Sequence, residues 1–140
     1  MDRITALSQI DRVISRFHKL TESVYNQKEK LVRDIKTNLE VEHFSGVRAC
    51  TNLIMLDQTK LELIEDIIYA LEMFAGCVPG EDGEGDAKEL GNEGVKVYRA
   101  LDNLQVHEVI SSMDQARAIT KAKEAVVDII MEFNENEVEV

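Results

Sequence analysis

The chain contains little that would interrupt or cross-link helices. Its 140 residues include one proline, two cysteines and no tryptophan. Because proline breaks a helix interior, a single proline leaves room for long helices. The longest unbroken apolar run covers only residues 67–71, far short of the roughly 20 residues of a membrane helix. The first residues, MDRITALSQIDR, lack the apolar core of a signal peptide. We therefore expect a cytoplasmic protein that does not span a membrane.

The two cysteines are too far apart to form a disulfide on one helix. Cys50 and Cys77 are 27 positions apart, which corresponds to roughly 40 Å along a continuous helix. A disulfide needs Cα atoms within about 7 Å of each other. We therefore expect two buried thiols that are not paired within the chain.

Acidic residues outnumber basic ones, 27 Asp and Glu against 16 Lys and Arg, which gives a formal net charge of −11. The balance is +2 for residues 1–40, −4 for residues 41–78 and −9 for residues 79–140. Such a chain is a poor candidate for direct nucleic-acid binding, because phosphate contact requires a basic face. The acidic surface predicts either solubility alone or a basic partner, which includes a protein whose nucleic-acid site the chain would mimic.

Apolar residues recur at helical spacing along most of the chain. Between residues 47 and 78 the steps alternate between three and four, which is the period of a helix packed lengthwise on another helix. This row contains Val47, Cys50, Ile54, Leu61, Ile64, Ile68, Leu71, Ala75 and Val78. The first helix has a similar row of Leu7, Ile10, Ile14, Phe17, Val24, Leu31 and Ile35, flanked by Tyr25, Val32 and Leu39. Two helices, at about 3–39 and 46–78, are therefore predicted to form an elongated hairpin.

The C-terminal half predicts two shorter helices after an acidic, glycine-rich loop at residues 79–86. The third helix begins at Asp86 and is weakened by Gly91 and Gly94, since glycine costs about 1 kcal/mol in a helix interior. The last helix begins at Ser112, and residues 134–140 are expected to be a frayed acidic tail. A chain of this length can build one core. We therefore expect a single all-α domain, residues 1–140, with the layout of a four-helix bundle.

The predicted hairpin has one polar interruption. Asp57 occupies the gap in the apolar row, and a capping signature at Thr59 and Glu62 would permit a kink there, although a continuous helix is preferred. Thr21 and Lys28 are polar at seam positions of the first helix. In an antiparallel hairpin these interruptions fall opposite one another, so we predict that Lys28 pairs with Asp57.

The acidic loop has a partial metal-binding pattern. Asp82, Glu84 and Asp86 alternate, and Glu93 is the twelfth residue counted from Asp82. This spacing resembles a calcium loop of the EF-hand type, which places oxygen ligands at positions one, three, five and twelve. The sixth position, where that loop uses glycine, is Ala87. Calcium binding through residues 82–93 is one alternative function, and a solvated acidic linker is the other interpretation of this stretch.

Carboxylate pairs on two helices provide a second alternative. Glu62 and Glu65 form an E-x-x-E pair, and Glu124 and Asp128 lie one turn apart on another helix. Magnesium requires only one or two protein carboxylates. This arrangement resembles the helical nucleotide pyrophosphohydrolases of the MazG type, and the resemblance implies a magnesium-dependent enzyme. The other interpretation is a solvent-facing acidic surface.

Two histidine patterns resemble further families over two residues each. Glu40 and His43 have the E-x-x-H spacing of ferritin-like di-iron proteins, but the sequence lacks the second motif that such a site needs. Arg12 and His18 resemble the R-x4–6-H motif of HEPN-type helical RNases, in which the motif lies in a later helix. Surface or packing roles are the simpler interpretation of these four residues.

The apolar face of the last helix is the predicted contact surface. It consists of Met113, Ile119, Val126, Ile130 and Phe133. We expect this face to bind a partner helix or to complete a homodimer. Small acidic helical chaperones of secretion and flagellar systems have a similar layout, which is a resemblance of composition and helix order. The favoured function is a non-enzymatic protein-interaction module without a cofactor: an adaptor, a chaperone or an inhibitor.

Overall fold

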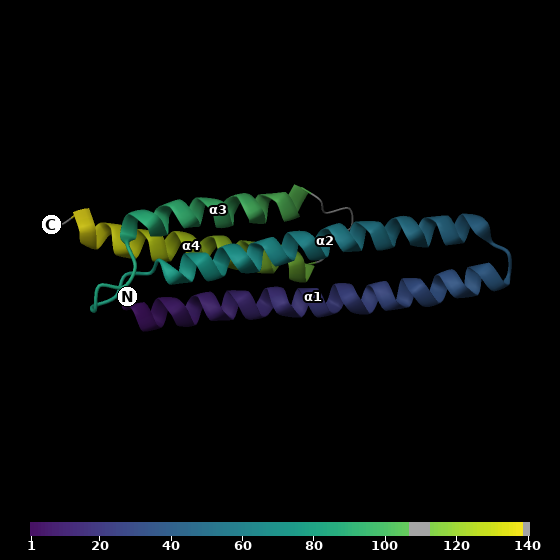
Figure 1. Cartoon of the computed structure of the whole chain (residues 1–140), viewed down its shortest axis with the longest axis horizontal. Coiled ribbons are helices and arrows are strands. Elements are labelled where there is room, and N and C mark those ends of the chain that lie inside the picture. Colours follow the sequence, from purple (N-terminus) through teal and green to yellow (C-terminus); the bar gives the residue numbers. More distant parts are fainter. Residues whose placement is uncertain (107–112, 139–140) are drawn as a thin grey trace.

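Four helices make up the part of the chain that the structure describes. It is a computed structural model, and it describes the backbone of residues 1–106 and 113–138 and the side chains through Asn134. The helices are α1 (Arg3–Glu40), α2 (Phe44–Gly76), α3 (Ala87–Val106) and α4 (Met113–Val138). Figure 1 shows that they run along one long axis. The predicted all-α architecture is confirmed. None of these four described helices is long and apolar enough to cross a membrane.

The hairpin formed by α1 and α2 is longer than the pair formed by α3 and α4. At about 1.5 Å per residue, the 38 residues of α1 extend about 57 Å and the 20 residues of α3 about 30 Å. α2 packs against α1 and α3, and α4 packs against α3 and α1, so the four helices form a closed ring. α3 and α4 lie along one end of the hairpin, and the opposite end, with the α1–α2 turn, extends beyond them (Figure 1).

Heptad rows from each helix meet in one hydrophobic cluster. Ile64, Leu71 and Val78 are seven residues apart in and just after α2, and each is at most 1% exposed. Burial of each such side chain stabilises the fold by roughly 1.5–3 kcal/mol relative to exposure. Other large members of the cluster are Ile10, Phe17, Ile67, Phe74, Leu90, Val97, Leu101, Leu104 and Ile129. The cluster therefore holds α3 and α4 against one end of the hairpin.

The acidic loop folds back onto the first turn of α1. Gly85 has a φ of 70° and lies against the backbone carbonyls of Cys77 and Val78, where a side chain could not fit. Arg3 donates from Nη1 to the Val78 carbonyl at 2.6 Å, and its Nε lies 3.7 Å from a carboxylate oxygen of Glu84. The loop is exposed, but these contacts attach it to the end of the bundle.

Most helix boundaries lie within a few residues of the predicted ones. α2 is continuous through residues 56–60, as preferred, and begins at Phe44 rather than near residue 46. α4 continues to Val138, so residues 134–138 of the tail that was predicted to fray are helical. Residues 139–140 and the predicted start at Ser112 lie outside the described residues. Gly94, predicted only to weaken α3, is buried beside Ile130, so its missing side chain lets α3 and α4 approach closely.

The two cysteines are unpaired, as predicted, but they are half-buried rather than buried. Cys50 lies within α2, and Cys77 follows its last residue. Burial raises the pKa of the Cys77 thiol, and the nearby carboxylates of Glu93, Glu89 and Asp86 add to this effect. Cys77 is therefore a poorly ionised thiol at neutral pH.

Candidate interaction surface

One end of the hairpin differs from the rest of the molecule in burial. Between Val24 and Asp57, a segment that is described throughout, Leu31 is the only buried residue. We call residues 25–56 the arm and all other residues the body. α3 and α4 pack on the hairpin in the body and do not extend along the arm (Figure 1). In the described structure, the arm is therefore two helices packed on each other without a third helix over them.

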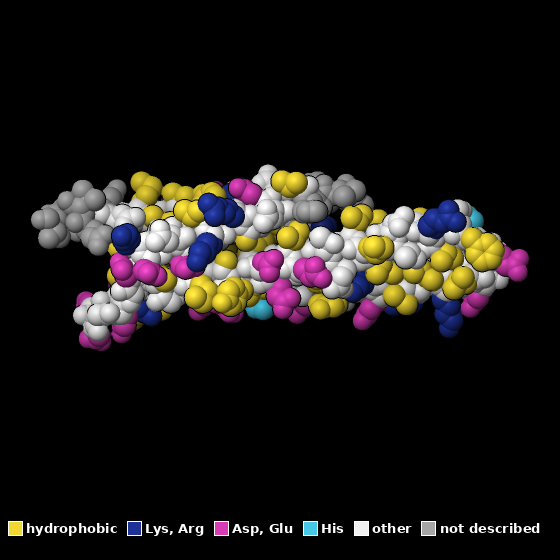
Figure 2. Space-filling model, turned by 45° about the horizontal axis from the view of Figure 1, so that its top comes forward, with side chains coloured by type: hydrophobic (Ala, Val, Ile, Leu, Met, Phe, Trp, Pro, Cys, Tyr) yellow, Lys and Arg dark blue, Asp and Glu magenta, His cyan; other side chains and the backbone are white. Residues whose placement is uncertain are grey.

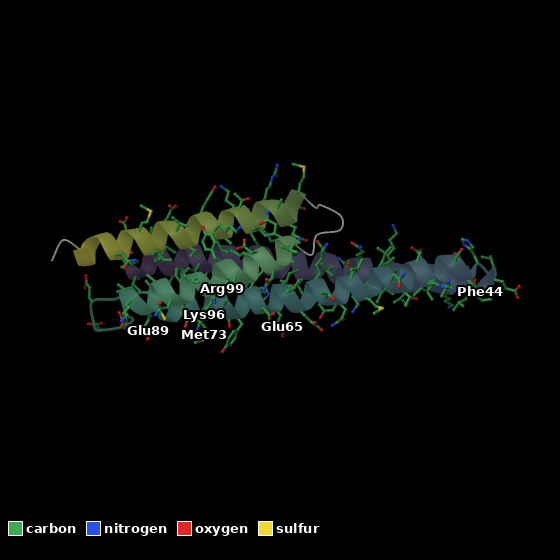
Figure 3. The ribbon with its side chains drawn as sticks, turned by 90° about the horizontal axis from the view of Figure 1, so that it is seen from above. Phe44, Glu65, Met73, Glu89, Lys96 and Arg99 are labelled. Carbon is green, nitrogen blue, oxygen red and sulfur yellow. The ribbon has the colours of Figure 1, made fainter. Side chains whose placement is uncertain are left out.

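Exposed apolar side chains form a row along the arm. Tyr25, Val32 and Leu39 of α1 are seven residues apart, so they lie on one side of the helix, and they are 54%, 56% and 50% exposed. We call these three residues the arm stripe. Phe44 and Met55 of α2 are 61% and 64% exposed. Figure 2 shows hydrophobic side chains gathered over this end of the molecule, and Figure 3 places Phe44 at its tip. An apolar row at helical spacing outside a core is typical of a surface that another helix covers.

The heptad position of the arm stripe is occupied by polar residues over most of the body. Counting back by sevens from Tyr25 gives His18 and Asp11, which are both exposed, and then Ile4 in the first turn of α1. The exposed acids of α2 also lie in the body: Glu62, Glu65, Asp66 and Glu72. A row that served solubility alone would be polar along its whole length. The change from polar to apolar at Tyr25 instead coincides with the start of the arm.

A three-residue turn gives the tip of the arm a defined backbone. The His43 amide donates to the Asn38 carbonyl at 2.8 Å, and the His43 ring lies 3.0 Å from both Asn38 Oδ1 and Ser45 Oγ. Gly46 lies against Asn38 and His43, where a side chain would clash. These contacts hold the turn in place, so the exposed apolar residues on both sides of it have defined positions.

The arm is nearly neutral although the chain is strongly acidic. Residues 25–56 contain five Lys and Arg and four Asp and Glu, which gives a net charge of +1. The rest of the chain contains 11 basic and 23 acidic residues, which gives a net charge of −12. A partner attracted by charge would bind the body, whereas the arm offers an apolar contact.

A buried carboxyl lies at the base of the arm. Asp57 is 5% exposed, and its Oδ2 has no hydrogen-bond partner in the described structure. Burial raises the pKa of the Asp57 carboxyl, and the nearby Lys60 and Lys28 act in the opposite direction. The predicted ion pair with Lys28 is not formed: Lys28 Nζ donates to Gln58 Oε1 at 2.8 Å. The two interruptions do lie opposite one another, as predicted, but Lys28 bonds to the amide next to Asp57 and makes no direct ion pair with its buried carboxyl.

The structure does not bring together the carboxylates of the calcium hypothesis. The candidates were Asp82, Glu84, Asp86 and Glu93. Within the described residues, no three metal-binding side chains form a group that could hold an ion. α3 begins at Ala87, the sixth position of the predicted binding loop. Asp86 instead accepts from the Lys88 amide at 2.9 Å, and Glu93 lies 3.1 Å from Lys96.

The carboxylates of the magnesium-enzyme hypothesis are also dispersed. Glu62 and Glu65 are exposed on α2, whereas Glu124 and Asp128 are exposed on α4. Each of these helices packs on α1 and α3, and the described parts of α2 and α4 do not pack on each other. The two pairs therefore lie on diagonally opposed helices and do not share a site.

The two histidine patterns lie on exposed parts of the hairpin. Glu40 is the last residue of α1, and His43 forms the turn described above. Arg12 and His18 are both exposed on α1, and their spacing of six residues places them on different sides of the helix. Within the described residues, Glu40 and His43 belong to no group of three potential metal ligands.

The apolar face of α4 is covered by the chain's own core. Ile119 and Val126 are 4% and 1% exposed, and Ile130 and Phe133 are partly buried against the hydrophobic cluster. Met113 is 70% exposed. Periodicity identified this face, but it could not show that helices of the same chain would pack on it. Partner binding by this face stays a prediction, and most of its apolar side chains are covered within the chain.

The arm stripe was not among the predicted contact residues, although a signal for it exists in the sequence. The first two predicted helices are much longer than the last two, so the last two cannot cover the hairpin along its whole length. Any apolar residue that flanks the seam at the uncovered end must then be exposed. Length and heptad position together would have identified Tyr25, Val32 and Leu39.

No protein-family model matches the chain, and searches of curated proteins and of solved structures found no match.

Proposed function

We propose that this chain is a non-enzymatic protein-interaction module, acting as an adaptor, a chaperone or an inhibitor, and that it contacts its partner through the arm. The observation that carries the proposal is the arm stripe, whose three side chains are each at least 50% exposed. Interfaces draw most of their affinity from a few anchor residues in the centre of a patch, among which tyrosine is enriched. Tyr25 is of this type, and Val32 and Leu39, one and two heptads further along α1, extend the apolar contact beside it.

The division of the molecule supports this proposal. The body contains the hydrophobic cluster and all of the net negative charge, so it supplies stability and solubility. No residue of the arm belongs to the cluster, and Leu31 is the only buried residue in the arm. The exposed side chains of the arm stripe are thus not required by the core of this chain, and contact with another protein is a use that accounts for them.

Affinity purification from the source cells tests the proposal. The bait is the tagged chain, either unchanged or with Val32→Glu and Leu39→Glu together. His18→Glu is the matched control, because His18 occupies the same heptad position in the body and is also exposed. We expect the double variant to lose at least about tenfold of the captured partner, which corresponds to about 1.4 kcal/mol, and the control to capture it normally.

Equal capture by all three baits would contradict the proposal. Circular dichroism checks that each variant keeps its helices, since substitutions at exposed helix positions change stability by only about 0.5 kcal/mol. The interaction module is favoured over the magnesium-enzyme and calcium-binding alternatives, because no three described His, Cys, Asp or Glu side chains form a group that could hold a metal ion.

A further inference from the structure

We infer that the partner covering the arm stripe is a second copy of this chain, docked arm to arm and antiparallel. The inference rests on the proposed function and names the occupant of the same surface. Each copy would contribute its arm to a central four-helix unit, and the two bodies would lie at opposite ends. The interface is isologous, so one patch on each copy is sufficient.

The arm stripe is self-complementary in the antiparallel direction. Tyr25 and Leu39 are each seven residues from Val32. A two-fold axis at Val32 therefore brings the two Val32 side chains together and places Tyr25 of each copy level with Leu39 of the other. A shift by one heptad toward the body would bring the polar His18 into the contact, which disfavours other registers.

The charge distribution favours a second copy over a charged partner. The arm carries a net charge of +1 and the body −12, so a basic protein would be drawn to the body. Two bodies placed side by side, as in a parallel dimer, would repel each other. In the antiparallel arrangement they are separated by the length of the arms, about 24 Å for the 16 residues from Tyr25 to Glu40, which exceeds the Debye length of about 8 Å at physiological salt.

The size of the contact predicts a reversible dimer. A patch about 24 Å long and about 20 Å wide, the breadth of two packed helices, covers roughly 500 Å² on each copy. The total of roughly 1,000 Å² lies at the lower limit for specific interfaces. The dimer should therefore dissociate on dilution.

Sedimentation analysis over a concentration series tests the inference. The unchanged chain should shift with concentration from its monomer mass of 15.8 kDa toward twice that mass. Val32→Glu places two like charges at the two-fold axis and should raise the dissociation constant at least about tenfold. Val32→Lys should do the same, whereas an equal mixture of the two variants should dimerise again. The matched control His18→Glu should behave like the unchanged chain.

Cross-linking distinguishes antiparallel from parallel docking. In a background with Cys50→Ala and Cys77→Ala, a short bismaleimide should link two copies of Val32→Cys. It should not link two copies of Tyr25→Cys, which would lie about 21 Å apart along the axis, but it should link Tyr25→Cys to Leu39→Cys in a mixture. A strong Tyr25→Cys homodimer product would overturn the antiparallel arrangement.

The two proposals fail in different ways. A chain that stays monomeric at all concentrations, or a dimer that is insensitive to Val32→Glu and Val32→Lys, overturns the inference of a second copy. The proposed function survives either result if the affinity purification still shows a partner lost with the arm variants. It fails if those variants capture everything that the unchanged chain captures.

Discussion

Replacing Asp57 should stabilise the protein, because this residue buries a carboxyl without a hydrogen-bond partner for Oδ2 in the described structure. A buried polar group left unsatisfied costs about 1–3 kcal/mol. Asp57→Asn keeps the shape and removes the charge, so we expect a gain of about 1 kcal/mol. Asp57→Val also removes the polar atoms, and the heptad-related residues Ile64 and Leu71 are apolar and buried. We expect Asp57→Val to gain about 1–3 kcal/mol.

Urea unfolding at several pH values, followed by circular dichroism, measures the effect. Because burial raises the folded-state pKa of Asp57 above the ordinary value of 3.8, the folded state holds more protons than the unfolded state between those two pKa values. The contribution of Asp57 to stability therefore falls as pH rises from about 3.8 through the raised pKa, and it stays at its lowest level above that pKa. The advantage of Asp57→Asn should be full above the raised pKa and should shrink as pH falls through it toward 3.8.

Asp66→Asn is the control, since Asp66 is exposed on the same helix and should change stability by no more than about 0.5 kcal/mol. The reasoning is refuted if Asp57→Asn lowers stability at pH 7 by about 1 kcal/mol or more. That result would mean that the attraction of Lys28 and Lys60 outweighs the cost of burial.

Two further predictions concern the body. Gly85→Ala should destabilise the protein by about 1–3 kcal/mol, because Gly85 has a positive φ and lies against backbone carbonyls; the control Gly91→Ala, with open space around it in α3, should stabilise it by about 0.5–1 kcal/mol. Thermal unfolding compares the two, and equal effects would contradict the assignment of Gly85 to a strained turn. In Cys50→Ser protein, Cys77 should react with iodoacetamide more slowly when folded than in urea, because burial and neighbouring carboxylates raise its pKa. Equal rates would show that the thiol is neither buried nor affected by those carboxylates.

The sequence predicted the helices well because their signals are local. The heptad row of Ile64, Leu71 and Val78 identified core positions that the structure confirms, and the interruption at residues 56–60 was correctly expected to leave α2 continuous. Gly94 was misjudged because its role depends on Ile130 of another helix. A helix propensity describes one residue in one helix and contains no information about such a close approach.

The candidate site was less predictable because exposure depends on which helices cover which. The last helix and the arm both have apolar rows, but Val126 is 1% exposed and Val32 is 56% exposed. That contrast follows from the relative lengths and the order of packing of the four helices, not from the rows themselves. Calcium binding stays a prediction: α3 begins at Ala87, within the stretch, and Glu93 lies beside Lys96.

The arm stripe and Asp57 both depart from what a stable, soluble helical bundle requires. The body encloses the hydrophobic cluster and carries most of the acidic residues. The arm exposes Tyr25, Val32 and Leu39 to water, and its base buries the unsatisfied Asp57. Each feature lowers stability or solubility without benefit to the isolated chain, and proteins tolerate such local conflicts chiefly where function requires them. If the arm of one copy binds the arm of another, the arm stripe becomes buried, and only Asp57 still lowers the stability of the protein. Dimerisation and the stability gained on replacing Asp57 should therefore be separable: Asp57→Asn should stabilise the chain, and Val32→Glu should leave its stability nearly unchanged while abolishing self-association at working concentrations.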